Sequence, residues 1–213
     1  MRIDKNDLLL YAVTDRQWLG EASLAEQLEE AIQAGVTVVQ LREKELDFDA
    51  FVSLGKELQA VAKRHRIPFI INDAVDVALA LDADGVHVGQ SDMQAGDVRS
   101  RIGEEKILGV SAHSVEEALA AERNGADYLG VGAIYGTATK PDANTLSIET
   151  LQQICQAVSI PVVGIGGIAE GNILNLNGSG IDGVAVVSAI FAQPGITAAV
   201  KRLRLLAEAM VQP

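Results

Sequence analysis

The stretch 106-KILGVSAHSVEEALAAERNGADYLGV-131 holds two apolar runs separated by a helical pattern. Its first five residues form a short apolar run, which is typical of a strand buried on both faces. Ser114 precedes Glu117 by the spacing of a capping box, and Gly125 is a typical helix stop, so residues 114–126 are predicted to be helical. A second apolar run ends the stretch. The whole therefore predicts a strand–helix–strand unit of a parallel sheet.

The same unit recurs along the chain, because short apolar runs alternate with amphipathic segments rich in Ala, Leu and Glu. The predicted strands are 8-LLLYAVT-14, 36-VTVVQL-41, 67-IPFII-71, 85-GVHV-88, 106-KILGV-110, 127-DYLGV-131, 161-PVVGI-165 and 182-DGVAVV-187. The clearest predicted helices are 23–35, 49–65, 73–84, 114–126, 147–158 and 195–210. Strand and helix are thus predicted to alternate eight times.

This alternation predicts an α/β fold, a single (β/α)8 TIM barrel that occupies residues 1–213 as one domain. The main alternative is an open doubly wound sheet. That fold usually carries G-x-G-x-x-G after its first strand, and 13-VTDRQWLG-20 lacks this pattern.

Composition limits the classes of partner. The formal charge of −12 disfavours nucleic acid, whereas a small phosphorylated ligand needs only a few local cations. No apolar run approaches the ~20 residues needed to span a bilayer, and no signal pattern opens the chain. The lone cysteine, Cys155, cannot form an internal disulfide and is expected to be a small buried residue. We therefore expect a cytoplasmic protein without a membrane partner.

Polar residues follow the predicted strands where a barrel gathers its active groups, just past the carboxyl ends. These residues are Gln40, Arg42, Glu43 and Lys44, Asn72 and Asp73, His87, Gln90 and Asp92, Ser111 and His113, Thr137, Thr139 and Lys140, 164-GIGGI-168, and Val187 and Ser188. The strand starts show no matching set, so the carboxyl rim is the predicted site.

Each cluster has a structural and a functional interpretation. Arg42 and Lys44 alternate, so both face one side of an extended segment, either as a solvated pair or as cations for an oligophosphate. Asp73 is either the N-cap or a first-turn acid of a helix or, with Asp92, a site for Mg2+ that also holds a phosphate. His87 is more typical of a packed, hydrogen-bonded barrel histidine than of a base.

The glycines of 164-GIGGI-168 form either a tight turn or half of a phosphate cup. The other half would be the backbone N–H groups near Val187 and Ser188, where 188-SAIFAQ-193 is predicted to begin a small helix. The rim therefore has two predicted places for anionic groups. The cup is sized for a single phosphate, and the cations with the two carboxylates are sized for a metal-bound pyrophosphate. Two phosphorylated substrates, one of which leaves as pyrophosphate, would occupy both places.

A set of motifs in the same order resembles the thiamine-phosphate synthase family from Tyr11 to Ile190. The motifs are 11-YAVTD-15, 40-QLREK-44, 72-ND-73, 85-GVHVGQSD-92, 109-GVSAHS-114, 130-GVGAIYGTATK-140, 163-VGIGGI-168 and 183-GVAVVSAI-190. Members of that family are (β/α)8 barrels that join hydroxymethylpyrimidine pyrophosphate to hydroxyethylthiazole phosphate, giving thiamine phosphate and pyrophosphate. The resemblance implies a transferase that uses one Mg2+ per subunit, with a homodimer as the family expectation.

The resemblance also implies roles for individual residues. Those expected to bind the pyrimidine pyrophosphate are Gln40, Leu41, Arg42, Glu43, Lys44, Asn72, Ser111 and Lys140, among which Arg42, Lys44, Ser111 and Lys140 are the expected catalytic residues. Those expected to bind the thiazole phosphate are Thr137, Ala138, Thr139, Gly167, Val187 and Ser188. Asp73 and Asp92 are expected to bind Mg2+. The expected reaction is dissociative, with departure of pyrophosphate ahead of attack by the thiazole nitrogen.

Two other functions are consistent with this pattern. A related thiazole tautomerase would use His113 for proton transfer and would need no Mg2+. A barrel that only binds phosphorylated metabolites would show no turnover. The family often has proline where Ala133 and Gly136 stand, which leaves the rigidity of this loop open.

Overall fold

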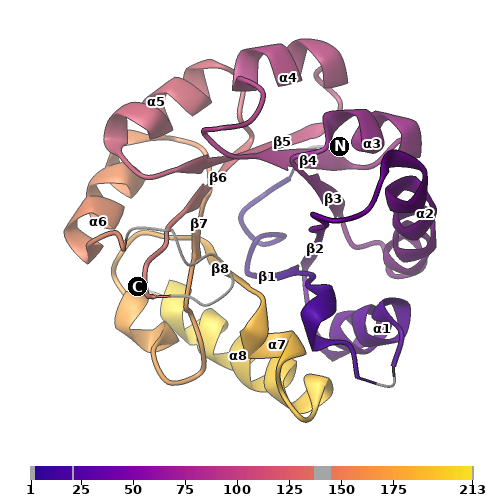
Figure 1. Cartoon of the computed structure of the whole chain (residues 1–213). Helices are drawn as coiled ribbons and strands as arrows, with labels where there is room; N and C mark the ends of the chain where they lie inside the picture. The colour runs from indigo at the N-terminus through magenta and orange to yellow at the C-terminus, as the bar shows by residue number, and fades with distance from the viewer. Residues whose placement is uncertain (1–2, 21, 137–144, 213) are drawn as a thin grey trace.

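The chain folds into a closed barrel of parallel strands in sequence order (Figure 1). The computed structural model describes residues 3–20, 22–136 and 145–212. The strands are β1 (Leu10–Val13), β2 (Val38–Leu41), β3 (Phe69–Asn72), β4 (Gly85–Val88), β5 (Ile107–Ala112), β6 (Tyr128–Val131), β7 (Val162–Ile165) and β8 (Gly183–Val186). Because β1 pairs with β8, the predicted barrel is confirmed and the open doubly wound sheet is wrong.

Helices surround the barrel (Figure 1). They are α1 (Leu24–Ala34), α2 (Phe48–His65), α3 (Val75–Leu81), α4 (Ala95–Ile102), α5 (Val115–Arg123), α6 (Ile148–Ala157), α7 (Ser188–Phe191) and α8 (Ile196–Val211), with the 3-10 helices η1 (Arg16–Trp18) and η2 (Ile173–Leu176). Within the described ranges, none of these helices has the length and apolar character needed to cross a membrane.

Side-chain caps set the starts of the predicted helices. Ser23 and Glu26 form the full capping box, with the carboxylate of Glu26 accepting from the Ser23 N–H and the Ser23 hydroxyl accepting from the Glu26 N–H. At α5 only half of the predicted box forms. The Ser114 hydroxyl accepts from the Glu117 N–H, but the Glu117 carboxylate accepts from the N–H of His113 instead.

The predicted alternation fails after β7. The connection to β8 contains the short η2 where the other strands are followed by an α-helix. Gly178 and Gly180 both have positive φ, at 74° and 91°, a left-handed conformation that ends helical structure. The glycines of this connection therefore replace a helix with turns.

Two separate cores flank the sheet. Inside the barrel, Tyr11, Val38, Ile70 and Tyr128 pack with other apolar side chains of alternate strand positions. The intervening positions pack outward against the helices, as Leu41 does. Because successive strand residues point to opposite faces, this alternation decides which polar residues can reach the barrel mouth.

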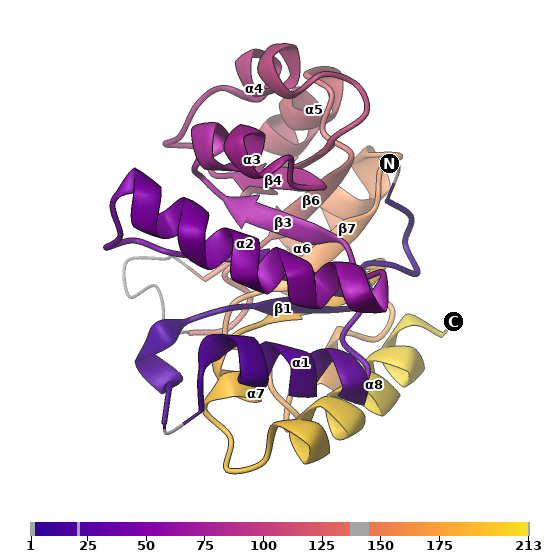
Figure 2. The same cartoon turned by 90° about the vertical axis from the view of Figure 1, so that its right-hand side faces the viewer.

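The amino ends of the strands are fastened by a repeated contact between neighbouring strands. A side chain just before an even-numbered strand accepts a hydrogen bond from the first backbone N–H groups of the preceding odd-numbered strand. The pairs are Thr37 with Leu10 (2.9 Å), Asp84 with Phe69 (2.9 Å), Asp127 with Leu108 (2.8 Å) and Asp182 with Val162 (3.0 Å). In Figure 2 the arrow of β3 points away from both chain termini, so the carboxyl end lies opposite them.

Candidate active site at the carboxyl end of the barrel

The predicted site residues that the structure describes all lie at or just past the carboxyl ends of strands. They are Gln40, Leu41, Arg42, Glu43 and Lys44 at β2, Asn72 and Asp73 at β3, Asp92 beyond β4, Ser111 in β5, Gly167 beyond β7, and Val187 and Ser188 beyond β8. Thr137, Ala138, Thr139 and Lys140 lie outside the described residues. Strand ends far apart in the sequence are thus brought to one rim, as the barrel requires.

Asp73 lies in a turn just past β3, and a backbone hydrogen bond to β4 holds this turn in place. Its φ is 60°, a left-handed conformation that Asp tolerates better than most residues. Its backbone N–H donates to the carbonyl of His87 at 2.8 Å. The first helical residue of α3 is Val75 and its N-cap is Ala74, so the interpretation of Asp73 as the helix cap is wrong.

Lys44 and Asp73 form an ion pair across the β2 and β3 ends, with 2.5 Å between Nζ and Oδ2. The lysine side chain is 54% exposed and the aspartate 27%. Solvent screens a pair this exposed, so it contributes little to stability and can open at small cost. One expected cation and one expected metal ligand are therefore neighbours.

Asp92 adds a second carboxylate to this group. Burial raises the pKa of Asp92 above its ordinary value, and the nearby negative charge of Asp73 raises it further. A hydrogen bond from the Gly89 N–H to Oδ2, at 2.7 Å, opposes the shift and holds the side chain in place. Two carboxylates that repel each other in this way favour a cation between them.

Two of the predicted residues do not offer a free side chain to a ligand. Leu41 is fully buried between the sheet and the helices. Glu43 lies 2.6 Å from Arg16 as an ion pair, although the angle is poor for a hydrogen bond, and accepts from the N–H groups of Lys44 and Glu45. Burial acts to raise the pKa of Glu43, but these contacts outweigh it and lower the pKa. Only the backbone of these two residues remains for a ligand.

The guanidinium of Arg42 is a second positively charged group at the same edge of the barrel. Its backbone N–H donates to the Thr14 hydroxyl at 3.2 Å, which fixes the chain just past β2. Its guanidinium has no hydrogen-bond or ion-pair partner among the described residues. Gln40 faces the barrel interior, where it contacts Tyr11, but β2 ends at Leu41, so the one-sided arrangement of Arg42 and Lys44 stays a prediction.

A chain of hydrogen bonds crosses the barrel interior beneath the rim. It links Gln40, Tyr11, Tyr128, His87 and Ser111, which come from β2, β1, β6, β4 and β5. His87 is therefore the packed, hydrogen-bonded residue that its position indicated. The two tyrosines were not among the predicted site residues, although their inward-facing strand positions are a signal that could have found them.

Glycines let the β6 and β7 loops approach each other closely. Backbone N–H groups of Ile134 and Tyr135 donate to Ile165 and Gly166 at 3.0 and 2.9 Å. Gly167 has φ 64°, and a Cβ there would lie 2.5 Å from the carbonyl oxygen of Gly136. The 164–168 segment is thus a glycine-dependent turn packed on the neighbouring loop, and Ser188 begins the predicted small helix α7.

The two loop positions whose rigidity the sequence left open are not equivalent. Ala133 is buried, and its carbonyl accepts from the Leu146 N–H at 2.7 Å. A Cβ on Gly136 would meet no described atom within 4 Å. Position 133 is therefore held by its neighbours, whereas the described surroundings leave room for a side chain at position 136.

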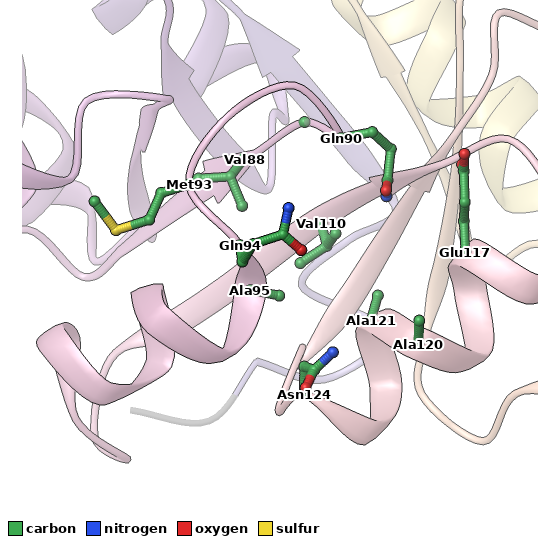
Figure 3. Close-up of a pocket in the computed structure, with 11 residues that line it drawn as sticks. Val88, Gln90, Met93, Gln94, Ala95, Val110, Glu117, Ala120, Ala121 and Asn124 are labelled. Carbon is green, nitrogen blue, oxygen red and sulfur yellow. The ribbon is translucent and has the colours of Figure 1, made fainter.

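A small cleft lies beside the rim, between α4 and α5 (Figure 3). Its volume is about 50 Å³, and Gln90, Met93, Gln94, Glu117 and Asn124 are among its lining residues. Gln90 donates to the Ser111 carbonyl at 2.6 Å. The cleft does not contain the cations or the carboxylate pair, so it lies outside the predicted site.

Comparisons with known proteins agree with this geometry. A family model described as thiamine monophosphate synthase matches residues 10–190. The chain is 54% identical to the thiamine-phosphate synthase of Clostridium acetobutylicum over 87% of this chain and 88% of that protein. The corresponding protein of Clostridium tetani is 51% identical over 92% of this chain and 94% of its own.

The chain belongs to the thiamine-phosphate synthase family. A solved structure of thiamine phosphate pyrophosphorylase from Pyrococcus furiosus superposes with a TM-score of 0.89 at 38% identity, covering 98% of this chain and 99% of that one. The predicted family, fold and function are therefore confirmed, and the chain is a transferase of this family.

Proposed function

We propose that the rim of the barrel binds a pyrimidine pyrophosphate and a thiazole phosphate side by side and joins them to thiamine phosphate. The observation that carries the residue assignment is the contact between Lys44 and Asp73 beside Asp92. It puts an expected pyrophosphate-binding cation and the expected metal ligands in one place.

The residues present fit Mg2+. Asp73 and Asp92 supply hard oxygen ligands, and the positive charge of Lys44 lies where their mutual repulsion calls for a cation. A pair of carboxylates is sufficient for Mg2+, because this ion often takes one or two carboxylates together with substrate phosphate and water. When bound there, Mg2+ would offset the negative charge that develops on the departing pyrophosphate.

The chain's own groups would do the rest by position and charge. Arg42 and Lys44 would grip pyrophosphate oxygens, and the Ser111 hydroxyl would donate to the same substrate. Lys140 is proposed to complete this set from the sequence alone. The glycine turn at Gly167 and the chain at Val187 and Ser188 would hold the thiazole phosphate, which aligns its nitrogen for attack. That nitrogen carries no proton, so no general base is required.

The tautomerase alternative would assign proton transfer to His113. Its Nδ1 lies 3.1 Å from the Glu117 carboxylate at the start of α5, and that carboxylate also accepts from the His113 backbone. The contact involves Nδ1, and a carboxylate at Nδ1 orients a histidine that transfers protons through Nε2, so the turnover assay is what separates the tautomerase from the synthase.

A coupled assay of pyrophosphate release tests the proposal. Purified protein is supplied with both substrates, with either one alone, and with or without Mg2+. We expect release only with both substrates and Mg2+. Isomerisation of a thiazole carboxylate phosphate without pyrophosphate release would favour the tautomerase, and binding without turnover would favour a sensor.

The setting of the enzyme is also part of the proposal. The lone, partly buried Cys155 agrees with a reducing cytoplasm. A homodimer with one Mg2+ per subunit is proposed from the family resemblance. Sedimentation of the purified protein, with and without Mg2+, would test the dimer.

A further inference from the structure

The hydrogen-bond chain inside the barrel has both of its ends at the candidate site. Gln40 Nε2 lies 2.9 Å from the hydroxyl of Tyr11, and that hydroxyl lies 2.8 Å from the hydroxyl of Tyr128. The Tyr128 hydroxyl lies 3.0 Å from Nδ1 of His87, and His87 Nε2 lies 2.9 Å from Ser111 Oγ. The chain therefore joins two expected substrate-binding residues through three residues with no assigned role.

The placement of the Gln40 amide nitrogen toward Tyr11 sets one direction for the hydrogens of the whole chain. An amide nitrogen can only donate, so Gln40 donates to Tyr11. Burial raises the pKa of both tyrosines, so each keeps its phenolic hydrogen at neutral pH. Tyr11 then donates to Tyr128, and Tyr128 donates to Nδ1 of His87. With Nδ1 accepting, the neutral imidazole carries its hydrogen on Nε2 and donates to Ser111.

Burial requires all the hydrogens of the chain to run in the same direction. Tyr11 and Tyr128 are 1% and 0% exposed, so a phenolic hydrogen without an acceptor would incur the full cost of desolvation. If His87 donated from Nδ1 while Gln40 donated at the other end, one phenol would be left without an acceptor. A fully reversed chain would need Gln40 to present its oxygen to Tyr11.

Two glycines make the space that the chain occupies. A Cβ on Gly109 in β5 would lie 2.3 Å from the hydroxyl oxygen of Tyr128 and 2.4 Å from Nδ1 of His87. A Cβ on Gly130 in β6 would lie 3.0 Å from Cε1 of His87. Both strands thus lack a side chain where the rings of Tyr128 and His87 lie. The hydrogen-bond chain therefore depends on glycine at these two positions.

We propose that Tyr11, Tyr128 and His87 are positioning residues that fix the polarity of the two ends of the pyrimidine subsite. Gln40 is held with its carbonyl oxygen available as an acceptor, and Ser111 is held with its hydroxyl hydrogen available as a donor. The ligand that matches has a hydrogen-bond donor, such as a ring amino group, at one end and an anionic oxygen at the other. This assignment rests on the proposed function of the rim.

The first test reads the tautomer of His87 directly. Nitrogen-15 spectra of the full-length protein near neutral pH report which ring nitrogen carries the hydrogen, and His87→Gln assigns its signals against those of His65 and His113. We expect the hydrogen on Nε2. A hydrogen on Nδ1, or on both nitrogens, would overturn the proposal. Because this readout needs no turnover, it stands even if the proposed reaction fails.

The second test separates the two substrates. Tyr128→Phe removes the donor to His87 and is expected to lower kcat/KM for the pyrimidine pyrophosphate by about fivefold, the scale of one hydrogen bond. The KM for the thiazole phosphate should stay unchanged. Tyr11→Phe, which breaks the chain one step earlier, provides a second variant should Tyr128→Phe fold poorly.

The matched control for these variants is Thr37→Val. This substitution removes the hydrogen bonds between the Thr37 hydroxyl and the Leu10 backbone, which lie at the amino end of the barrel. We expect it to lower stability and leave both KM values unchanged. Equal effects of Tyr128→Phe on both substrates, or effects no different from those of Thr37→Val, would reduce the tyrosines to a structural role and contradict the proposal.

Discussion

The ammonium of Lys44 lies 2.5 Å from Oδ2 of Asp73, one of the two carboxylates proposed to hold Mg2+. The contact joins residues just past β2 and β3, which the sequence analysis assigned to the same pyrophosphate and metal half of the site. Since the pair is half-exposed and weak, Lys44 can leave Asp73 for a pyrophosphate oxygen when the carboxylates gain a metal. The cation of the site and its metal ligands therefore form one electrostatic unit.

Replacing Lys44 should impair the pyrimidine half of the reaction. We expect Lys44→Gln to lower kcat/KM for the pyrimidine pyrophosphate by about tenfold or more, which corresponds to about 1.4 kcal/mol of lost transition-state stabilisation. Steady-state release of pyrophosphate measures it. Lys106→Gln is the matched control, because Lys106 pairs with Asp82 away from the rim. Equal kinetics for the two variants would remove Lys44 from the site.

Asp92→Asn should separate activity from stability. Because burial and Asp73 raise the pKa of Asp92, ionising this carboxyl costs more free energy in the folded state than in the unfolded chain. Removing the charge should raise the Tm measured without Mg2+, while turnover with Mg2+ falls by about tenfold or more. The Tm gain should disappear as pH falls through the raised pKa, where the wild-type carboxyl is already protonated. A lower Tm at neutral pH, or full activity, would contradict this assignment.

The amino-end contacts should matter for stability alone. Asp84→Ala removes the acceptor of the Phe69 N–H and is expected to lower the free energy of unfolding by about 1–3 kcal/mol. Urea denaturation measures this loss, and kinetics of the folded variant should be unchanged. Glu57→Ala, at an exposed position of α2, should stay within about 0.5 kcal/mol of wild type. A kinetic defect in folded Asp84→Ala would show that this end also serves the reaction.

Cys155 should be unreactive in the native protein. Burial raises the pKa of its thiol to about 12, with a further contribution from Asp182. At pH 8 the thiol is therefore almost wholly protonated, and the thiolate is the reactive form. We expect slow alkylation by iodoacetamide in buffer and rapid alkylation in urea. Rapid labelling of the folded protein at pH 8 would show that the thiol is accessible and ionised.

Much of the architecture could be predicted from local patterns. The apolar runs define the strands because a parallel sheet buried on both faces demands continuous apolar sequence. Ser23 and Ser147 mark helix starts because their hydroxyls satisfy free backbone N–H groups, as they do in the structure. The predicted strand–helix alternation was wrong after β7, because the glycines of that segment favour turns over an α-helix.

The sequence by itself determined the barrel and the rim, because strand order places every carboxyl end at one edge and alternation decides which side chains face inward. Only the tertiary structure decided how the rim residues are used. Glu43 is committed to Arg16, and Asp73 faces Lys44 instead of capping α3. Tyr11 and Tyr128, which are 117 residues apart in the chain, share a hydrogen bond across the interior. Such contacts depend on closure of the barrel, which sets distances between strands that no local pattern records.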